Sequence, residues 1–240
     1  MKKTILFFLT LIFLFTFCKK ESEKQYVLVF SKTTGFRHPS ITDGKLAIII
    51  LGKENGFDVD TTENAEQFTD ENLRKYSAII FLSTTGDVLN IDQQVAFERF
   101  IKGGGGFVGI HAATDTEYDW DWYGRLVGAY FESHPRIQTA DIIVVDSLNA
   151  STRHLPPKWS RTDEWYNFKN MKNDIKVLLK IDEKSYEGGT MGNNHPMAWY
   201  HEFDGGRSFY TELGHTQESY SDPLYLKHVL GGIQYAIEKP

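Results

Sequence analysis

Cysteine is almost absent from this sequence, since Cys18 is the only one among 240 residues. It lies close to the N-terminus, where an apolar run ends, so the long remainder of the chain contains none. A protein body without cysteine forms no disulfide framework, cannot bind zinc through thiolates and cannot use a thiol as its nucleophile. Any catalytic or metal-binding chemistry must therefore use other side chains.

Basic residues are also relatively few. The chain has 26 lysines and arginines against 32 acidic residues, and its net charge is -6. Two of the lysines lie in the first 18 residues, which contain no acid, so the body carries 24 basic against 32 acidic residues. An acidic body argues against nucleic acid as a partner. It suits a neutral or cationic ligand, although acidic surfaces commonly serve only solubility.

Hydrophobic residues are plentiful enough for one sizeable core. They make up 41% of the 240 residues, and aromatic residues make up 14%. Domains of this length commonly form around a single core. We find neither an internal repeat nor a second domain boundary, so the sequence predicts a single folded domain.

The N-terminus has the composition of an export signal. Lys2 and Lys3 precede an apolar run over residues 4–17, which is shorter than a usual transmembrane span. This run, followed by Cys18, resembles a bacterial lipoprotein signal with Cys18 as the lipidated residue; an ordinary secretory signal or an uncleaved anchor is the alternative. We therefore expect an exported protein, in the periplasm or at the cell surface, held at the membrane by a lipid anchor. The expected divisions are a signal peptide over 1–18, a linker over 19–25 and a folded domain over 26–240.

Short apolar strands alternate with helices in the first half of the chain. Ser40 is a candidate N-cap for a helix from 41 to about 54, and Thr69 opens a short helix. An amphipathic helix covers 92–102. The expected strands are 26–30, 57–60, 77–82 and 107–110. This βαβ rhythm predicts an α/β fold with a doubly wound, mostly parallel sheet and helices on both faces.

The second half is less regular. Asp222 and Pro223 mark the start of a last helix, because Asp is a good N-cap and Pro suits the first helical position. Residues 184–194 contain three glycines and no apolar period, which indicates a loop. The other expected elements are an aromatic-rich helix over 118–127, strands over 137–145, 165–168 and 176–181, and a hairpin of strands 197–203 and 208–213.

The most informative stretch begins with four glycines, 103–106. They end the preceding helix and start the strand 107–110, which is short and apolar enough to be a buried parallel strand. The strand ends abruptly at His111, which has small residues on both sides. Small neighbours allow the sharp turn of a nucleophile elbow, which presents one side chain at the carboxyl end of a strand. Acyl-transfer enzymes place Ser or Cys there, so His111 argues against covalent acyl transfer.

Ligand sites of doubly wound sheets lie beyond the carboxyl ends of the strands. Three segments follow strands of the first half in this way: 34–38, 83–87 and 111–115. Near the C-terminus, Gly214 and His215 end another strand in a turn of small residues. The sequence therefore predicts that side chains from these segments meet at one edge of the sheet.

Six segments together resemble one known family. They are Gly35-Phe36-Arg37-His38, residues 104–113, Asp163-Glu164-Trp165-Tyr166, His195-Pro196-Met197-Ala198-Trp199, Gly205-Gly206-Arg207 and Gly214-His215-Thr216. The chain is similar, over roughly residues 26–239, to the trehalose-utilisation (ThuA-like) family, which is itself similar to class I glutamine amidotransferases. The resemblance implies a flavodoxin-like sheet and a role with oxidised (3-keto) sugars or glycosides.

The resemblance to amidotransferases also indicates what this chain lacks. Those enzymes place Cys at the elbow, with a His and a Glu near the last strand. Here His111 replaces the Cys, and His215 with Glu218 falls where the other two residues would lie. Without a thiol at the elbow, we expect no glutaminase or amidotransferase activity.

Three imidazoles near a carboxylate form a candidate metal site. His111, His215 and His38 could bind a divalent ion such as zinc or manganese, together with Asp163 or Glu164. Without a metal, His111 could act as general base and His215 as general acid near neutral pH. Either scheme suits a keto-sugar, because the ketone acidifies the neighbouring C–H. The glycosidic bond can then break by elimination, followed by hydration.

The remaining site residues are candidates on chemical grounds. We expect Glu164 to act in catalysis beside His111 and His215. The aromatic residues between 118 and 123 suit either sugar stacking or a core, and each polar candidate also has an interpretation as a turn or surface residue. The expected substrate-binding residues are His38, Asp163, Tyr166, His134, His195 and Arg207.

These expectations converge on an exported lyase or hydrolase that acts on a small-molecule sugar, such as a 3-keto-glycoside or a related disaccharide. A second hypothesis is a non-catalytic carbohydrate-binding or accessory protein of a sugar-oxidation pathway. A third is a structural partner of a sugar dehydrogenase complex. The sequence leaves open whether the protein forms a homo-oligomer.

Overall fold

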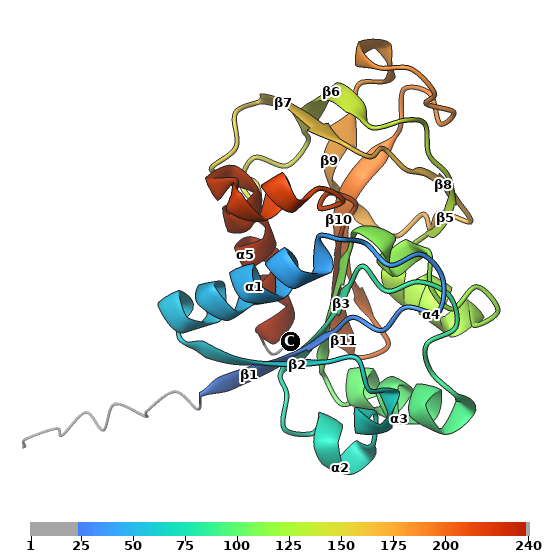
Figure 1. The fold of residues 1–240 in the computed structure, drawn as a ribbon, viewed down its shortest axis with the longest axis vertical. Helices are drawn as coiled ribbons and strands as arrows, with labels where there is room; N and C mark the ends of the chain where they lie inside the picture. Colours follow the sequence, from blue (N-terminus) through green and yellow to red (C-terminus); the bar gives the residue numbers. More distant parts are fainter. Residues whose placement is uncertain (1–23, 239–240) are drawn as a thin grey trace, which may run out of the picture.

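A computed structural model describes residues 24–238 of the chain (Figure 1). The expected signal peptide, the expected lipidation site Cys18 and most of the expected linker lie outside these described residues. Between residues 24 and 238, no helix combines the length and the apolar character that crossing a bilayer requires.

A single nine-stranded sheet organises the molecule, in the order β2-β1-β3-β4-β11-β10-β9-β6-β7. Neighbours from β2 to β11 pair in parallel, whereas neighbours from β11 to β7 pair antiparallel. The predicted doubly wound α/β sheet is therefore confirmed, and an antiparallel half extends it. In chain order the strands are β1 (Gln25–Phe30), β2 (Phe57–Thr62), β3 (Ala78–Leu82), β4 (Gly106–Ile110), β6 (Gln138–Val144), β7 (Lys158–Asp163), β9 (Lys176–Ile181), β10 (Pro196–Phe203) and β11 (Gly206–Thr211).

Helices cover both faces of the parallel half, as predicted (Figure 1). On one face, α1 and α5 share a core cluster that includes Ile48 and Val229. On the other, α3 and α4 contribute Phe97 and Tyr123 to a second cluster. Every residue of β3 and β4 is consequently buried, which explains their continuous apolar sequences. The helices are α1 (Ile41–Asn55), α2 (Asp70–Leu73), α3 (Ile91–Lys102), α4 (Asp121–Val127) and α5 (Pro223–Ile237).

A second, two-stranded sheet lies beside the first. It pairs β5 (Tyr130–Ser133) with β8 (Asn167–Lys169) in antiparallel register. The sequence analysis missed β5 and β7, and the strand expected over 165–168 begins only at Asn167. Strand β7 consists mostly of polar residues, and its pairing with β6 outweighs its weak intrinsic preference for a strand.

Two local expectations are corrected. The side chain of Ser40 does not cap α1; its hydroxyl instead donates to the carbonyl oxygen of Gly214 at 3.2 Å. The aromatic-rich helix starts at Asp121 rather than at residue 118. Trp120 and Trp122 stack on each other with ring centroids 5.1 Å apart, inside the cluster under α3. Of their two interpretations, the structure therefore favours a core.

The elbow after β4 is strained, as its sequence predicts. His111 has a φ of 51°, in the left-handed region that residues other than glycine rarely adopt. It opens a short 3₁₀ turn, His111–Thr114. Tyr210 Oη donates to the His111 carbonyl oxygen at 2.7 Å, and a Cβ on Gly109 would lie 2.9 Å from Tyr210 Cδ2. The small residue before the elbow thus makes room for the tyrosine that holds it.

The turn after β11 requires glycine for two reasons, which a pair of substitutions separates. Gly214 has a φ of 116°, and an added Cβ would lie 2.4 Å from the hydroxyl oxygen of Tyr225. Gly56 also has a positive φ, of 82°, but nothing lies within 4 Å of an added Cβ. We expect Gly56→Ala to lower the free energy of unfolding by about 1 kcal/mol. Gly214→Ala should lower it by roughly 3 kcal/mol, because a clash adds to the strain.

Urea denaturation of both variants measures this difference. Equal losses of stability would show that the space around Gly214 is not constrained by Tyr225.

Candidate metal centre

Four side chains from distant parts of the chain converge at the carboxyl edge of the parallel strands. His38 lies in the loop after β1, His111 at the elbow after β4 and His215 in the turn after β11, while Glu164 directly follows β7. One ligand atom from each lies within 4.8 Å of the others. The structure thus brings together the three histidines that the sequence analysis grouped, and it selects Glu164 rather than Asp163 as their carboxylate.

The spacing of these atoms fits a tetrahedral ion. His111 Nε2 lies 3.2 Å from His38 Nε2, 3.2 Å from His215 Nδ1 and 3.6 Å from Glu164 Oε2. Glu164 Oε2 lies 3.0 Å from His215 Nδ1. Ligands at about 2.0–2.1 Å from a zinc ion stand about 3.3 Å apart at the corners of a tetrahedron. Very little movement is therefore needed to accept an ion.

Second contacts orient the His111 ring. Its Nδ1 donates to the backbone carbonyl oxygen of Glu212 at 2.8 Å, which leaves the lone pair of Nε2 directed toward the cluster. The hydroxyl of Tyr166 lies 3.1 Å from the same Nε2. Tyr166 is fixed in turn by its backbone N–H, which donates to Glu212 Oε1 at 3.1 Å. Glu212 therefore positions both residues.

Burial keeps His38 neutral. Loss of solvation, together with the nearby rings of His111 and His215, lowers the pKa of His38 to about 3. Within residues 24–238, its buried Nδ1 has no hydrogen-bond partner. A neutral imidazole is the form that binds a metal ion, so His38 is held ready as a ligand.

Glu164 has the opposite electrostatic character. Burial raises the pKa of its carboxyl group, but hydrogen bonds from His111 and His215 outweigh burial and hold the pKa well below its usual range. For His215, burial lowers the pKa, but the hydrogen bond with Glu164 dominates and leaves it raised. Glu164 is thus an ionised carboxylate, and metal binding must displace the proton that it stabilises on His215.

Asp163 is brought to the site as a support rather than as a ligand. Its carboxylate accepts the backbone N–H groups of Gly214 and His215, each at 3.1 Å, and pairs with Arg161 at 3.0 Å. The aspartate is fully buried. It therefore fixes the turn that carries His215, which differs from the expected substrate-binding role.

His134 lies at the rim of the cluster. Its side chain is 43% exposed, and its Nδ1 lies 3.0 Å from Glu164 Oε1 and 2.9 Å from the carbonyl oxygen of Pro135. Both partners are acceptors, so we assign the hydrogen to Nδ1. This assignment leaves Nε2 as a basic nitrogen on a partly exposed ring.

Two expected substrate-binding residues lie outside the cluster. His195 is buried, and its ring nitrogens contact Glu183 Oε1 and the Tyr166 carbonyl oxygen, each at 2.7 Å. It therefore supports Tyr166 from behind. Arg207 stands at the start of β11, at the opposite end of the strand from His215, and its guanidinium lies over the Tyr235 ring. Its expected role is wrong because the hairpin turn places it at the other edge of the sheet.

Sequence reasoning also missed one functional residue and misjudged another. Glu212 was not singled out, and the only available signal was an acid directly after a buried strand. Its side chain is fully buried, and burial, followed by the charge of Asp163, raises its pKa well above the usual range. Glu218, expected to accompany His215, is exposed. Its place is taken by Glu164.

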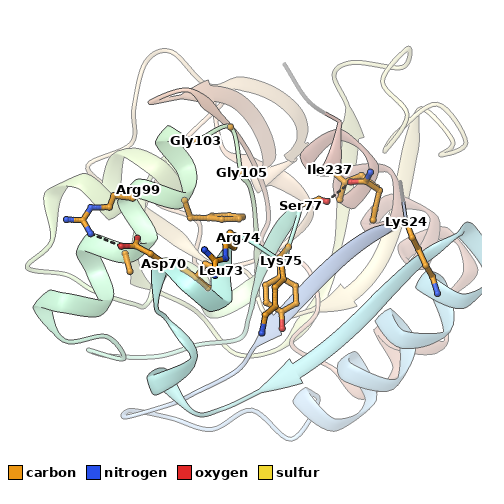
Figure 2. Close-up of a pocket in the computed structure, with 15 residues that line it drawn as sticks. Lys24, Asp70, Leu73, Arg74, Lys75, Ser77, Arg99, Gly103, Gly105 and Ile237 are labelled. Carbon is orange, nitrogen blue, oxygen red and sulfur yellow. Dashed lines mark hydrogen bonds and ion pairs between the residues drawn. The ribbon is translucent and has the colours of Figure 1, made fainter. Parts of the chain in front are cut away.

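The most prominent cavity lies elsewhere (Figure 2). It has a volume of about 440 Å³ and is lined by the glycines 103–105 at the amino edge of the sheet. Two of its basic residues are already paired, Arg99 with Asp70 at 2.8 Å and Lys24 with Asp58 at 2.7 Å. The converging ligand atoms at the carboxyl edge are a stronger indication of chemistry than this cavity, because ligand sites of such sheets lie there.

Solved structures with the same arrangement define the class. A protein from Bacteroides uniformis described as ThuA-like matches with a TM-score of 0.75 and 20% identity, over 92% of this chain and 95% of that chain. One from Parabacteroides merdae, also described as ThuA-like, has a TM-score of 0.72 and 18% identity, over 89% and 90%. A Thermoplasma acidophilum protein described as a GMP synthase component has a TM-score of 0.53 and 12% identity, over 90% and 97%.

The fold and its elbow thus define an α/β protein of the class I glutamine amidotransferase-like kind, with histidine at the elbow. The chain belongs to the ThuA family, described as trehalose utilisation, whose model matches residues 26–236. Among curated proteins, none matches this sequence.

Asp163 provides a test of how the site is supported. Asp163→Asn keeps the shape of the side chain but leaves the buried Arg161 without its charged partner. We expect the free energy of unfolding to fall by about 3 kcal/mol. The affinity for zinc should also fall, because the turn bearing His215 loses its anchor.

Asp141→Asn is the matched control, because it removes an ion pair whose lysine, Lys158, has a side chain 58% exposed. Its stability should remain close to that of the wild type. Chemical denaturation and zinc titration measure both quantities. Equal behaviour of the two variants would contradict the support role of Asp163.

Proposed function

We propose that the chain binds a divalent ion, zinc or manganese, through His38, His111, His215 and Glu164. The convergence of three imidazole nitrogens and a carboxylate oxygen within 4.8 Å supports this proposal. Nitrogen ligands suit zinc, and the carboxylate also admits manganese. When bound, the ion would polarise a carbonyl oxygen of a ligand and stabilise negative charge on it.

The proposed substrate is an oxidised sugar, such as a 3-keto-glycoside or a related disaccharide. The family description, trehalose utilisation, supports a carbohydrate. The side chains support acid–base chemistry, since the body has no cysteine and the elbow carries His111. A base removes the proton from the carbon beside the ketone. The electron pair forms a C=C bond, the glycosidic C–O bond breaks, the leaving oxygen takes up a proton, and water then adds across the double bond.

His134 is the residue of this chain best placed to move that proton. When the nitrogens of His111 and His215 hold an ion, they are no longer available as base and acid. His134 keeps a basic Nε2, because its Nδ1 hydrogen faces Glu164 and the Pro135 carbonyl oxygen. Its side chain is 43% exposed, which allows contact with a substrate. In the metal-free scheme, His111 and His215 exchange the proton themselves.

Metal content and turnover together test this function. The chain from residue 19 onward, purified without a histidine tag, should contain stoichiometric metal by elemental mass spectrometry. His111→Ala and His215→Ala should lose both the metal and the cleavage of a methyl 3-keto-glucoside. His134→Ala should keep the metal and lose turnover by about 10²–10⁴-fold. The control is His228→Gln, because His228 is buried against Ser151 and Thr211, away from the cluster.

Each outcome separates the hypotheses. Metal retained in His111→Ala and His215→Ala would refute the metal centre. A wild type without metal but with turnover would favour the acid–base pair of His111 and His215. Saturable binding of sugars without turnover would favour a carbohydrate-binding or accessory protein instead.

We also propose that the protein is exported and anchored to the membrane through a lipid on Cys18. The basic residues, apolar run and cysteine at the N-terminus support this. In a bacterial host, the wild type should fractionate with membranes and incorporate a labelled fatty acid. Cys18→Ser should do neither, and label in the Cys18→Ser protein would place the lipid elsewhere.

A further inference from the structure

A carboxylate stands at the edge of the metal cluster and has no part in it. Asp115 follows the elbow turn by one residue and is partly buried. Tyr118 Oη donates to its Oδ1 at 2.7 Å, and within residues 24–238 the carboxylate makes no other hydrogen bond. Burial raises the pKa of Asp115, while the hydrogen bond from Tyr118 and the charges of His111, Lys169 and His134 lower it in part. These interactions place Asp115 beside the cluster and leave one of its oxygens available.

A cation and an apolar ring complete this neighbourhood. Lys169 is exposed, and its Nζ lies over the Tyr118 ring, 4.8 Å from the centroid. The Phe131 ring is partly buried, with its centroid 4.4 Å from that of Tyr166 and 5.9 Å from that of His134. Tyr118 Oη also lies 3.1 Å from the Phe131 carbonyl oxygen. A continuous set of contacts therefore leads from the proposed metal ligands to Asp115.

The two-stranded sheet explains why these groups meet. Strand β5 carries Phe131 and leads into His134, and strand β8 carries Lys169 at its end, shortly after Tyr166 and Asn167. Pairing places Phe131 opposite Phe168. The main sheet thus supplies the metal cluster, and the small sheet supplies the residues beside it.

We propose that Asp115 and Lys169 bind hydroxyl groups of the substrate, next to the Phe131 ring, in a subsite beside the metal cluster. This inference rests on the proposed function and names the residues that recognise its substrate. A carboxylate accepts from a hydroxyl and an ammonium donates to one, so the pair binds a neutral polyol. Asp115 disfavours an anion and Lys169 disfavours a cation. An aromatic ring beside such groups contacts the apolar face of a sugar.

The test uses methyl glucoside, which lacks the ketone and is not consumed, and its mono-deoxy analogues. Isothermal titration of the zinc-loaded chain gives the dissociation constant. We expect Asp115→Asn and Lys169→Met each to weaken binding of methyl glucoside about tenfold or more. One deoxy analogue should bind the wild type at least tenfold more weakly than methyl glucoside does. Asp115→Asn should not distinguish the two sugars, because the hydroxyl and the carboxylate form one interaction.

Matched controls remove the same charges from exposed residues nearby in the chain or on the surface, Asp119→Asn and Lys184→Met. Both should bind like the wild type, and all four variants should keep their metal content and melting temperature. If the wild type binds methyl glucoside and Asp115→Asn and Lys169→Met bind it equally well, the subsite is wrong while the proposed function stands. If the wild type binds no sugar, the proposed substrate class is wrong, and the subsite is refuted with it.

Discussion

The hydrogen bond between His111 Nδ1 and the Glu212 carbonyl oxygen is the contact on which the site depends. It is 2.8 Å long and joins the ends of β4 and β11, which are parallel neighbours in the sheet. It decides which nitrogen of His111 faces the cluster. It also requires the left-handed backbone at His111, because an extended residue would direct its ring along the strand. The strain of about 1–3 kcal/mol at such a residue is offset by this bond and by the Tyr210 hydroxyl.

Three buried acids lie close together behind this contact. Asp163 is paired with Arg161, Glu164 with the histidines, and Glu212 accepts from a backbone amide. Each has a different partner, so the repulsion between them is reduced by distinct means. A concentration of carboxylates under three imidazoles makes the edge of the sheet electrostatically receptive to a cation. The same arrangement destabilises the empty protein, because each buried charge costs solvation energy.

Much of the parallel half could be predicted from sequence, because its strands are apolar throughout and its helices have clear caps. His111 and His215 could be found because each follows such a strand in a turn of small residues. The choice of Glu164 over Asp163 could not, since adjacent acids of one loop differ only in the partners that tertiary pairing gives them. Glu212 left no signal, because it acts through its backbone carbonyl and a buried side chain. Strands β5 and β7 are short or polar, and long-range pairing decides them.

The separation of the ligands along the chain has a consequence for how an ion is acquired. His38 and His111 are 73 positions apart, and His111 and His215 are 104 apart. No local segment holds two of the four ligands, so a partly folded chain offers no chelating site, unlike a zinc finger with closely spaced ligands. Loop closure over such distances comes late in folding. The ion is therefore taken from the compartment in which folding finishes, and the metals available there, more than intrinsic affinity, decide which one the protein carries.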